Sequence, residues 1–214
     1  MRVTSERSVL FIDGNNWYHG LKKIGVDAYD LDYAEVGKKL VKGRTLAEIR
    51  FYIGRVRGDR LRAARQQWQL DRLQRQGVRL FLGRIQRNPV PPDKNPALVE
   101  LRELLAQTPP GTPPALRRRL TELCRKSFVS YVEKQADVWI AVDLVSMAYR
   151  DEYDVAYLLS ADADYVSAVR EVGGMGKKVF PVRSWRDRSA ELDKVVKAIP
   201  LKREWFDELS TGDS

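Results

Sequence analysis

Short apolar segments alternate with longer segments of helical periodicity along most of the chain. The apolar segments are short and almost uniformly apolar, which is typical of strands buried in a parallel sheet. The predicted strands are residues 8–12, 48–53, 78–82, 155–159 and 177–182, and the predicted helices are residues 32–41, 59–76, 137–149, 165–172 and 189–198. Asp59 and Ser189 are candidate N-caps. The alternation predicts an α/β fold: a three-layer α/β/α sandwich with a central, mostly parallel twisted sheet.

One proline-rich segment interrupts this alternation. Residues 88–114 contain eight of the ten prolines, and proline fixes φ and lacks a backbone donor. Helices fit over residues 96–106 and from 114 to 126, so we predict a helical insertion at about 88–128 within a single domain of residues 1–209. The insertion is either a lid or substrate guide, or an ordinary long connection. Residues 210–214 are expected to form a flexible tail.

Composition narrows the class of protein. The 214 residues include 38 Lys and Arg against 29 Asp and Glu, a net charge of +9, which favours a polyanionic partner. One cysteine excludes an intrachain disulfide and a multi-cysteine zinc site. No apolar run reaches the length of about 18 residues that a membrane helix needs, and residues 1–8 lack the apolar stretch of a signal peptide. We therefore expect a cytoplasmic protein without a membrane partner.

Aspartates follow two of the predicted strands and begin a later helix. Asp13 comes directly after the apolar residues 9–12, Asp162 and Asp164 follow residues 155–159, and Asp137 begins a helix. Because functional crevices in open α/β sheets lie beyond the carboxyl ends of the strands, we expect these carboxylates to meet at one edge. A single aspartate after a strand is most often a turn former or a helix cap, so the prediction depends on their joint occurrence.

Convergence of these acids would require either a compensating positive charge or protonation of some of the acids. Two carboxylates about 4 Å apart repel each other by roughly 4 kcal/mol at an effective dielectric constant of about 20. Oxygen ligands favour a hard cation, Mg²⁺ or Mn²⁺, which can activate water and stabilise charge on a phosphoryl group. The sequence thus predicts that the catalytic and metal-binding residues are Asp13, Asp137, Asp162 and Asp164.

Further polar residues are expected to support this site. Asn16 could orient a water or a ligand carboxylate, and Ser160 could form a hydrogen bond within the pocket or contact phosphate. Asp143 lies six residues after Asp137, which places the two side chains about 120° apart around a helix. Asp143 is therefore expected to be a buried, hydrogen-bonded acid or a support for the site.

Two segments after predicted strands combine basic and aromatic residues. Arginine can bind phosphate in a bidentate manner, and tryptophan can stack on an unpaired base of any identity. Solvated arginines around a half-buried tryptophan are the alternative interpretation. The candidate nucleic-acid-binding residues are Arg55, Arg57, Arg183, Trp185, Arg186 and Arg188.

Three sequence blocks resemble the NYN domain, a PIN-like nuclease family that includes LabA-like bacterial proteins. The blocks are residues 11–16 (FIDGNN), 133–138 (EKQADV) and 159–165 (LSADADY), in the order of the family. The resemblance implies a PIN-like sheet, an acidic Mg²⁺ or Mn²⁺ site and RNA cleavage. It matches Asp13, Asn16, Asp137, Asp162 and Asp164 to the family's site residues, and Lys134 to a lysine often found before the helix acid. Ala161 departs from the family, which commonly has glycine there.

The leading hypothesis is a metal-dependent endoribonuclease that acts on RNA with unpaired regions. One alternative is a regulatory protein that binds RNA without cutting it. Another is a phosphatase or nucleotide-binding enzyme, although no G-x-G-x-x-G or Walker loop follows the first predicted strand. PIN-like relatives often dimerise, so the resemblance also allows a homodimer.

Overall fold

The computed structural model describes residues 5–56, 59–125 and 128–209. The chain divides into two compact units. Unit 1 comprises Met1–Arg84 and Glu133–Ser214, and unit 2 comprises Ile85–Val132.

A parallel sheet forms the centre of unit 1. Its strands lie in the order β3-β2-β1-β5-β6-β7, with β4 next to β3, and every neighbouring pair from β3 to β7 is parallel. The strands are β1 (Arg7–Asp13), β2 (Thr45–Arg55), β3 (Arg79–Val90), β4 (Phe128–Lys134), β5 (Val155–Leu159), β6 (Lys178–Ser184) and β7 (Ile199–Leu201). The predicted fold class is confirmed.

The strand order reverses between β1 and β5. From β1 the chain proceeds to β2 and β3 on one side, whereas β5, β6 and β7 extend the sheet on the other side. Ile12 pairs with Leu159, so Asp13 and Ser160 are the next residues on the two adjacent strands at their carboxyl ends. Ligands of open α/β folds bind at such a switch point.

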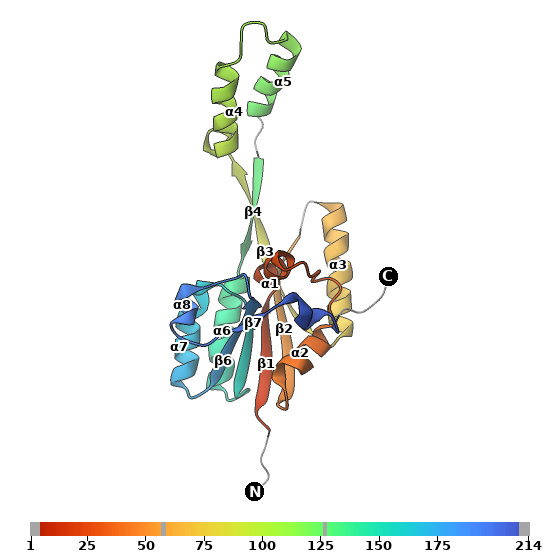
Figure 1. Cartoon of the computed structure of the whole chain (residues 1–214), viewed down its shortest axis with the longest axis vertical. Helices are drawn as coiled ribbons and strands as arrows, with labels where there is room; N and C mark the ends of the chain where they lie inside the picture. Colours follow the sequence, from red (N-terminus) through yellow and green to blue (C-terminus); the bar gives the residue numbers. More distant parts are fainter. Residues whose placement is uncertain (1–4, 57–58, 126–127, 210–214) are drawn as a thin grey trace. The chain divides into compact units, whose positions relative to one another are not determined.

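Helices cover both faces of this sheet (Figure 1). Leu10 and Ile12 point into one core, which α1 and α2 cover, whereas Val9 and Phe11 point into the other core, which α6 and α7 cover. This alternation follows from the two-residue period of a strand. The helices of unit 1 are α1 (Gly14–Lys23), α2 (Tyr33–Val41), α3 (Arg60–Arg75), α6 (Ala136–Tyr149), α7 (Val166–Gly174) and α8 (Ala190–Asp193), and its short 3₁₀ helices are η2 (Ala163–Tyr165) and η3 (Arg203–Phe206).

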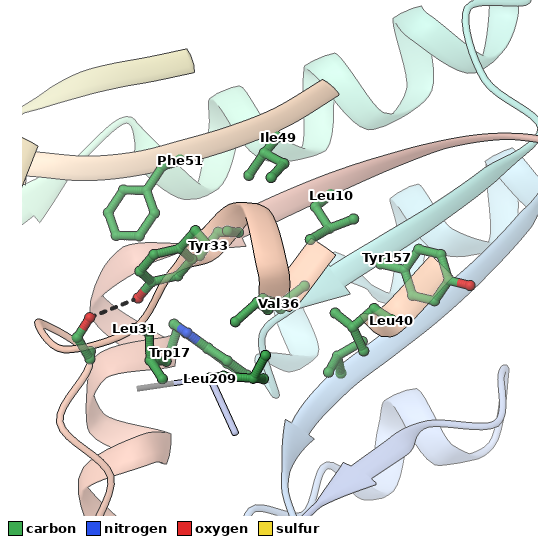
Figure 2. Packing of buried hydrophobic residues seen from close by; sticks show 14 of the residues in the cluster. Leu10, Trp17, Leu31, Tyr33, Val36, Leu40, Ile49, Phe51, Tyr157 and Leu209 are labelled. Atoms are coloured by element: carbon green, nitrogen blue, oxygen red, sulfur yellow. Dashed lines mark hydrogen bonds between the residues drawn. The ribbon is translucent and has the colours of Figure 1, made fainter. Parts of the chain in front are cut away.

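Aromatic residues fill the first of these cores. Figure 2 shows Tyr33 packed between Phe51 and Trp17, with its hydroxyl directed away from the apolar side chains. That hydroxyl donates a hydrogen bond to the carbonyl of Ala28 at 3.3 Å, and burial raises the pKa of Tyr33. The polar atom is thus satisfied without opening the core.

Gly14 allows α1 to begin directly against β2. A Cβ atom at this position would lie 2.6 Å from the ring of Phe51 and 2.9 Å from the carbonyl oxygen of Tyr52. Only glycine therefore fits where the chain turns from β1 into α1.

Unit 2 is a helical hairpin. It contains η1 (Pro92–Lys94), α4 (Pro96–Ala106) and α5 (Pro114–Cys124), and proline occupies the first position of each. The Arg102 guanidinium donates a hydrogen bond from α4 to the carbonyl of Cys124 at the end of α5, at 2.9 Å. The predicted helix 96–106 coincides with α4, and α5 ends two residues before the predicted position 126.

Some elements differ from the predictions. Strands β4 and β7 were not predicted, and α8 is much shorter than the predicted helix 189–198. Proline disfavours helix at the residue before it, which confines the effect of Pro200 to Ile199, the first residue of β7. Asp59 caps α3 by accepting a hydrogen bond from the Arg62 amide, whereas Ser189 makes no such capping bond. Across the described ranges, every helix is too short or too polar to cross a membrane.

Candidate functional site

A cavity of about 280 Å³ opens at the carboxyl ends of β1 and β5. All of its lining residues belong to unit 1, and three of them are predicted site acids from three separate elements. The lining residues are Asp13, Asn15, Asn16, His19, Lys23, Ala136, Asp137, Ala161, Asp162 and Asp187.

Asp13 is the most deeply buried acid of the cavity. It ends β1 and caps α1, and one carboxylate oxygen accepts a hydrogen bond from the Asn16 amide at 3.1 Å. The other oxygen accepts hydrogen bonds from the Tyr165 hydroxyl at 3.0 Å and from the Ser160 hydroxyl at 3.3 Å. Burial raises the pKa of Asp13, the three hydrogen bonds oppose that shift, and the charge of Asp162 adds to it. Every one of these donors is neutral.

The segments after β1 and β5 are tied to each other by hydrogen bonds. The Asn16 side-chain oxygen accepts a hydrogen bond from the Ala161 amide at 3.0 Å. The Ser160 hydroxyl, which donates to Asp13, also accepts a hydrogen bond from the Asp162 amide at 3.1 Å. Asn16 and Ser160 therefore fix the position of Asp162 relative to Asp13.

Asp137 lies in the first turn of α6, where the helix dipole favours a negative charge. Gln135 precedes the helix in a left-handed conformation (φ 86°) and makes no capping hydrogen bond with its side chain. A non-glycine residue in this region is strained, and such strain often occurs at functional sites. The Gln135 turn brings Ala136 and Asp137 to the cavity.

The Tyr165 hydroxyl interacts electrostatically with Asp13, Asp137 and Asp162. Burial raises the pKa of its hydroxyl first, and the charges of Asp13, Asp137 and Asp162 raise it further. The hydroxyl therefore stays protonated and donates to Asp13. Within the described part of the chain, none of these three carboxylates forms a salt bridge, so they line the cavity without a direct cationic partner.

One wall of the cavity was not predicted. Asn15, His19 and Lys23 recur every four residues and so form one face of α1, and this face lines the cavity. Lys23 forms an ion pair with Asp187, which comes from the segment after β6. The four-residue spacing could have indicated the shared face, but the pairing of Lys23 with Asp187 spans 164 residues and has no local sequence signal.

Three other predicted acid-site residues lie away from the cavity lining. Asp164 is exposed, and its amide donates a hydrogen bond to the Asp162 carboxylate at 3.0 Å. Asp143 accepts hydrogen bonds from the Arg50 guanidinium at 2.9 Å and from the Tyr52 hydroxyl at 2.7 Å, so it ties α6 to β2. Lys134 is exposed at the end of β4.

The predicted basic residues fall into different environments. Arg183 lies within β6, is buried, and donates hydrogen bonds to both carboxylate oxygens of Asp193 at 2.6 and 2.8 Å. Trp185, Arg186 and Arg188 are exposed in the segment after β6, and Arg55 is exposed at the end of β2. Arg57 lies outside the described residues.

One part of the chain, from the end of the proline-rich segment into β7, matches a known family model. Residues 110–200 match the family model of the NYN domain. The predicted NYN resemblance is confirmed over these residues, whereas the LabA-like subtype stays a prediction. NYN domains are generally PIN-like nucleases that bind RNA. Asp137 and Asp162 lie inside the NYN match, and Asp13 reaches the same cavity from outside it.

Comparison with solved structures agrees with this fold. The crystal structure of a protein of unknown function from Vibrio parahaemolyticus is similar to this chain, with a TM-score of 0.59 and 17% sequence identity over 99% of each chain. At that identity, the likeness bears on the fold alone. The comparison with curated proteins gave no significant match.

The side chains of the cavity offer the oxygen ligands that suit a hard divalent cation. Asp13, Asp137, Asp162 and the two asparagines offer oxygen ligands, and Asp13 is a buried carboxylate with a raised pKa and only neutral partners. Within residues 5–56, 59–125 and 128–209, no three acidic, histidine or cysteine side chains already stand in metal-binding geometry. The carboxylates would therefore have to move closer together around an ion.

Proposed function

We propose that this protein is a Mg²⁺- or Mn²⁺-dependent endoribonuclease that cleaves phosphodiester bonds of RNA in single-stranded or unpaired regions. One observation carries the proposal: carboxylates from β1, the segment after β5 and α6 line one cavity without a cationic partner among the described residues. The NYN match supports the nuclease class. The net charge of +9 suits a polyanionic substrate.

In this proposal Asp13, Asp137 and Asp162 are the metal ligands. A divalent ion held there would activate water and offset the charge that develops on the phosphoryl group. The Ser160 and Tyr165 hydroxyls orient Asp13 through their hydrogen bonds, and Asn16 holds the Ala161 backbone beside it. Such supporting contacts typically affect metal affinity or activity by about 10-fold to 100-fold.

The remaining predicted residues have secondary roles in the proposal. Asp164 adds negative charge at the rim beside Asp162, and Lys134 attracts the substrate phosphate. Asp143 anchors α6 through Arg50 and Tyr52, and so supports the position of Asp137 on the same helix.

A cleavage assay tests the proposal. Labelled single-stranded RNA, single-stranded DNA and a small phosphomonoester are incubated with the purified full chain in Mg²⁺, Mn²⁺ or EDTA. We expect RNA cleavage that needs a divalent ion and falls at least about 100-fold in Asp162→Asn. Asparagine can still cap η2, so this variant should fold. Asp164→Asn is the matched neighbour and should lose less activity, because Asp164 does not line the cavity.

A second candidate function rests on the lack of preassembled ligand geometry among the described residues. A protein that binds RNA without cutting it would use the same surface without drawing its carboxylates around an ion. RNA binding without cleavage in either metal would support this candidate and contradict the nuclease. Preferential hydrolysis of the phosphomonoester would indicate a phosphatase instead.

A further inference from the structure

A second groove adjoins the acidic cavity, and Lys23 lines both. This groove, of about 660 Å³, lies entirely within unit 1. Three segments that are distant in the sequence form it: the end of α1, the segment after β6 and the start of η3. Six of its lining residues are cationic or aromatic, namely Lys22, Lys23, Trp185, Arg186, Lys202 and Arg203. We refer to this set as the basic groove.

Hydrogen bonds to backbone carbonyls hold the three segments together. The Trp185 amide donates a hydrogen bond to the Leu201 carbonyl at 2.9 Å, which joins the segment after β6 to the end of β7. The Arg186 guanidinium donates a hydrogen bond to the Lys23 carbonyl at 3.0 Å, which joins the same segment to α1. The groove is therefore built on elements of the sheet and its covering helix rather than on a free loop.

The groove combines an aromatic surface with positive charge. The Trp185 side chain is 49% exposed, and the Arg186 guanidinium lies 5.3 Å from the centre of its ring. Five of the six residues are cationic, and Glu204 is the acid among the groove's lining residues. Lys23 already pairs with Asp187 on the cavity side, so Lys22, Lys202 and Arg203 remain as the main cations for an incoming anion.

We propose that the basic groove binds the unpaired strand of RNA that flanks the scissile phosphate. This inference rests on the proposed function, because it takes the acidic cavity as the place of cleavage. A base of the flanking strand stacks on Trp185, and Lys202 and Arg203 contact its phosphates. Because Lys23 lines both the acidic cavity and the basic groove, a continuous RNA strand can pass from the groove to the carboxylates.

The chemistry of the groove selects a single strand. Stacking on tryptophan needs a base that is free of its own stack and pair, and it tolerates any base. Cationic side chains that contact phosphates make the binding dependent on salt, with a slope of about 0.7 per phosphate for single strands. A duplex offers phosphates but no free base face, so it loses the contribution of Trp185.

Fluorescence anisotropy in EDTA measures this binding without cleavage. The full chain is titrated against labelled single-stranded RNA and against a blunt RNA duplex. We expect Trp185→Ala to weaken single-strand binding by about 5-fold to 150-fold, the range of one base–aromatic stack. Trp185→Phe should retain most of the affinity. Trp68→Ala removes another half-exposed tryptophan, on α3 outside the groove, and should change little.

A charge variant tests the phosphate contacts. Lys202→Ala combined with Arg203→Ala should weaken binding and lower the salt slope by about 1.4. Lys42→Ala combined with Lys178→Ala removes two charges at the opposite edge of the sheet and should leave the slope unchanged. Circular dichroism and thermal unfolding confirm that each variant folds.

The outcomes separate this inference from the nuclease proposal. If Trp185→Ala and the Lys202/Arg203 variant bind single-stranded RNA as tightly as the wild type does, the groove inference is overturned while cleavage can still occur. An equal loss of duplex binding in Trp185→Ala also overturns it, because stacking would not be the cause. Binding that depends on the groove, in a protein that cuts nothing in either metal, would support single-strand binding by the groove and contradict the nuclease.

Discussion

Carboxylates at the two edges of the parallel sheet have different hydrogen-bond partners and opposite pKa shifts. At the amino edge, Asp154 accepts hydrogen bonds from the Arg7 amide at 2.8 Å and from the Arg7 guanidinium at 3.0 Å, and Lys177 lies 3.2 Å away. These bonds, with the Arg7 side chain first, hold the pKa of Asp154 well below its usual range. At the carboxyl edge, Asp13 has only neutral donors, and burial raises its pKa.

The difference separates acids that hold the fold together from acids that are available to a ligand. Glu6 follows the pattern of Asp154, because Lys178 and Arg44 pair with it at 2.7 and 2.8 Å and lower its pKa. Asp13, Asp137 and Asp162 line the cavity without such a pairing, and burial of an unpaired carboxylate such as Asp13 costs stability unless a cation binds. The same residue type can thus form salt bridges that stabilise the fold at one edge of a sheet and remain available to a ligand at the other edge.

Substitution of one aspartate at each edge of the sheet should give the largest contrast in activity. Asp13→Asn should lower metal-dependent RNA cleavage at least about 100-fold, because it removes a ligand charge. Its unfolding free energy should stay the same or rise, since a buried charge is lost while an oxygen acceptor remains. Asp154→Asn should leave the cleavage rate within about twofold and lower stability instead. Initial cleavage rates and urea unfolding of both variants measure this contrast. A similar loss of activity in Asp13→Asn and Asp154→Asn would contradict it.

The same contrast should appear along the single helix α6. Asp143→Asn leaves the buried Arg50 guanidinium with weaker partners, so the free energy of unfolding should fall by about 1–3 kcal/mol. Asp137→Asn should lower cleavage and change the free energy of unfolding by less than about 0.5 kcal/mol, because Asp137 is exposed and unpaired with any described cation. Urea unfolding at neutral pH checks the first effect, and cleavage assays check the second. If Asp143→Asn and Asp137→Asn lowered the free energy of unfolding equally, the distinction between a structural and a functional acid on α6 would be contradicted.

Acid titration should give small stability changes of opposite sign at the two edges. The pKa of folded Asp154 is below the ordinary value of 3.8, so its contribution is complete above that pH and is lost as the pH falls further. The pKa of folded Asp13 is above 3.8, so its destabilising effect develops as the pH rises from that value through the raised pKa. The free energy of unfolding of Asp13→Asn relative to the wild type should therefore rise with pH. The free energy of unfolding of Asp154→Asn is lower than that of the wild type at neutral pH, and this difference should shrink in acid. Unfolding curves at a series of pH values measure both differences, and a parallel course of the two would contradict the assignment.

Local patterns were enough to predict the elements that carry the acids. The apolar residues 9–12 lie within β1, and residues 155–159 are the whole of β5. The rule that sites lie at the carboxyl ends of strands then predicted Asp13 and Asp162 at one edge of the sheet. Strand β4 carried a signal that could have been used, because its sequence FVSYVEK is rich in β-branched and aromatic residues. Strand β7 has three residues and includes Pro200, so it has almost no local signal.

Long-range pairing explains what the sequence could not predict about the site. Asp162 and Asp164 look equivalent in the sequence, but Asp162 lines the cavity whereas Asp164 is exposed. Arg183 looked like a phosphate contact until the structure showed it buried against Asp193. The ion pair of Lys23 with Asp187 arises only when α1 packs beside the segment after β6. The burial and pairing of these side chains depend on tertiary packing, which no short motif encodes.

Calorimetric titration with Mn²⁺ tests the central claim most directly, because it measures the cation site without any substrate. The wild type and Asp154→Asn should bind the ion with equal affinity, and Asp13→Asn should bind it at least about tenfold more weakly. Equal binding by Asp13→Asn and the wild type, or no binding by the wild type, would contradict the account.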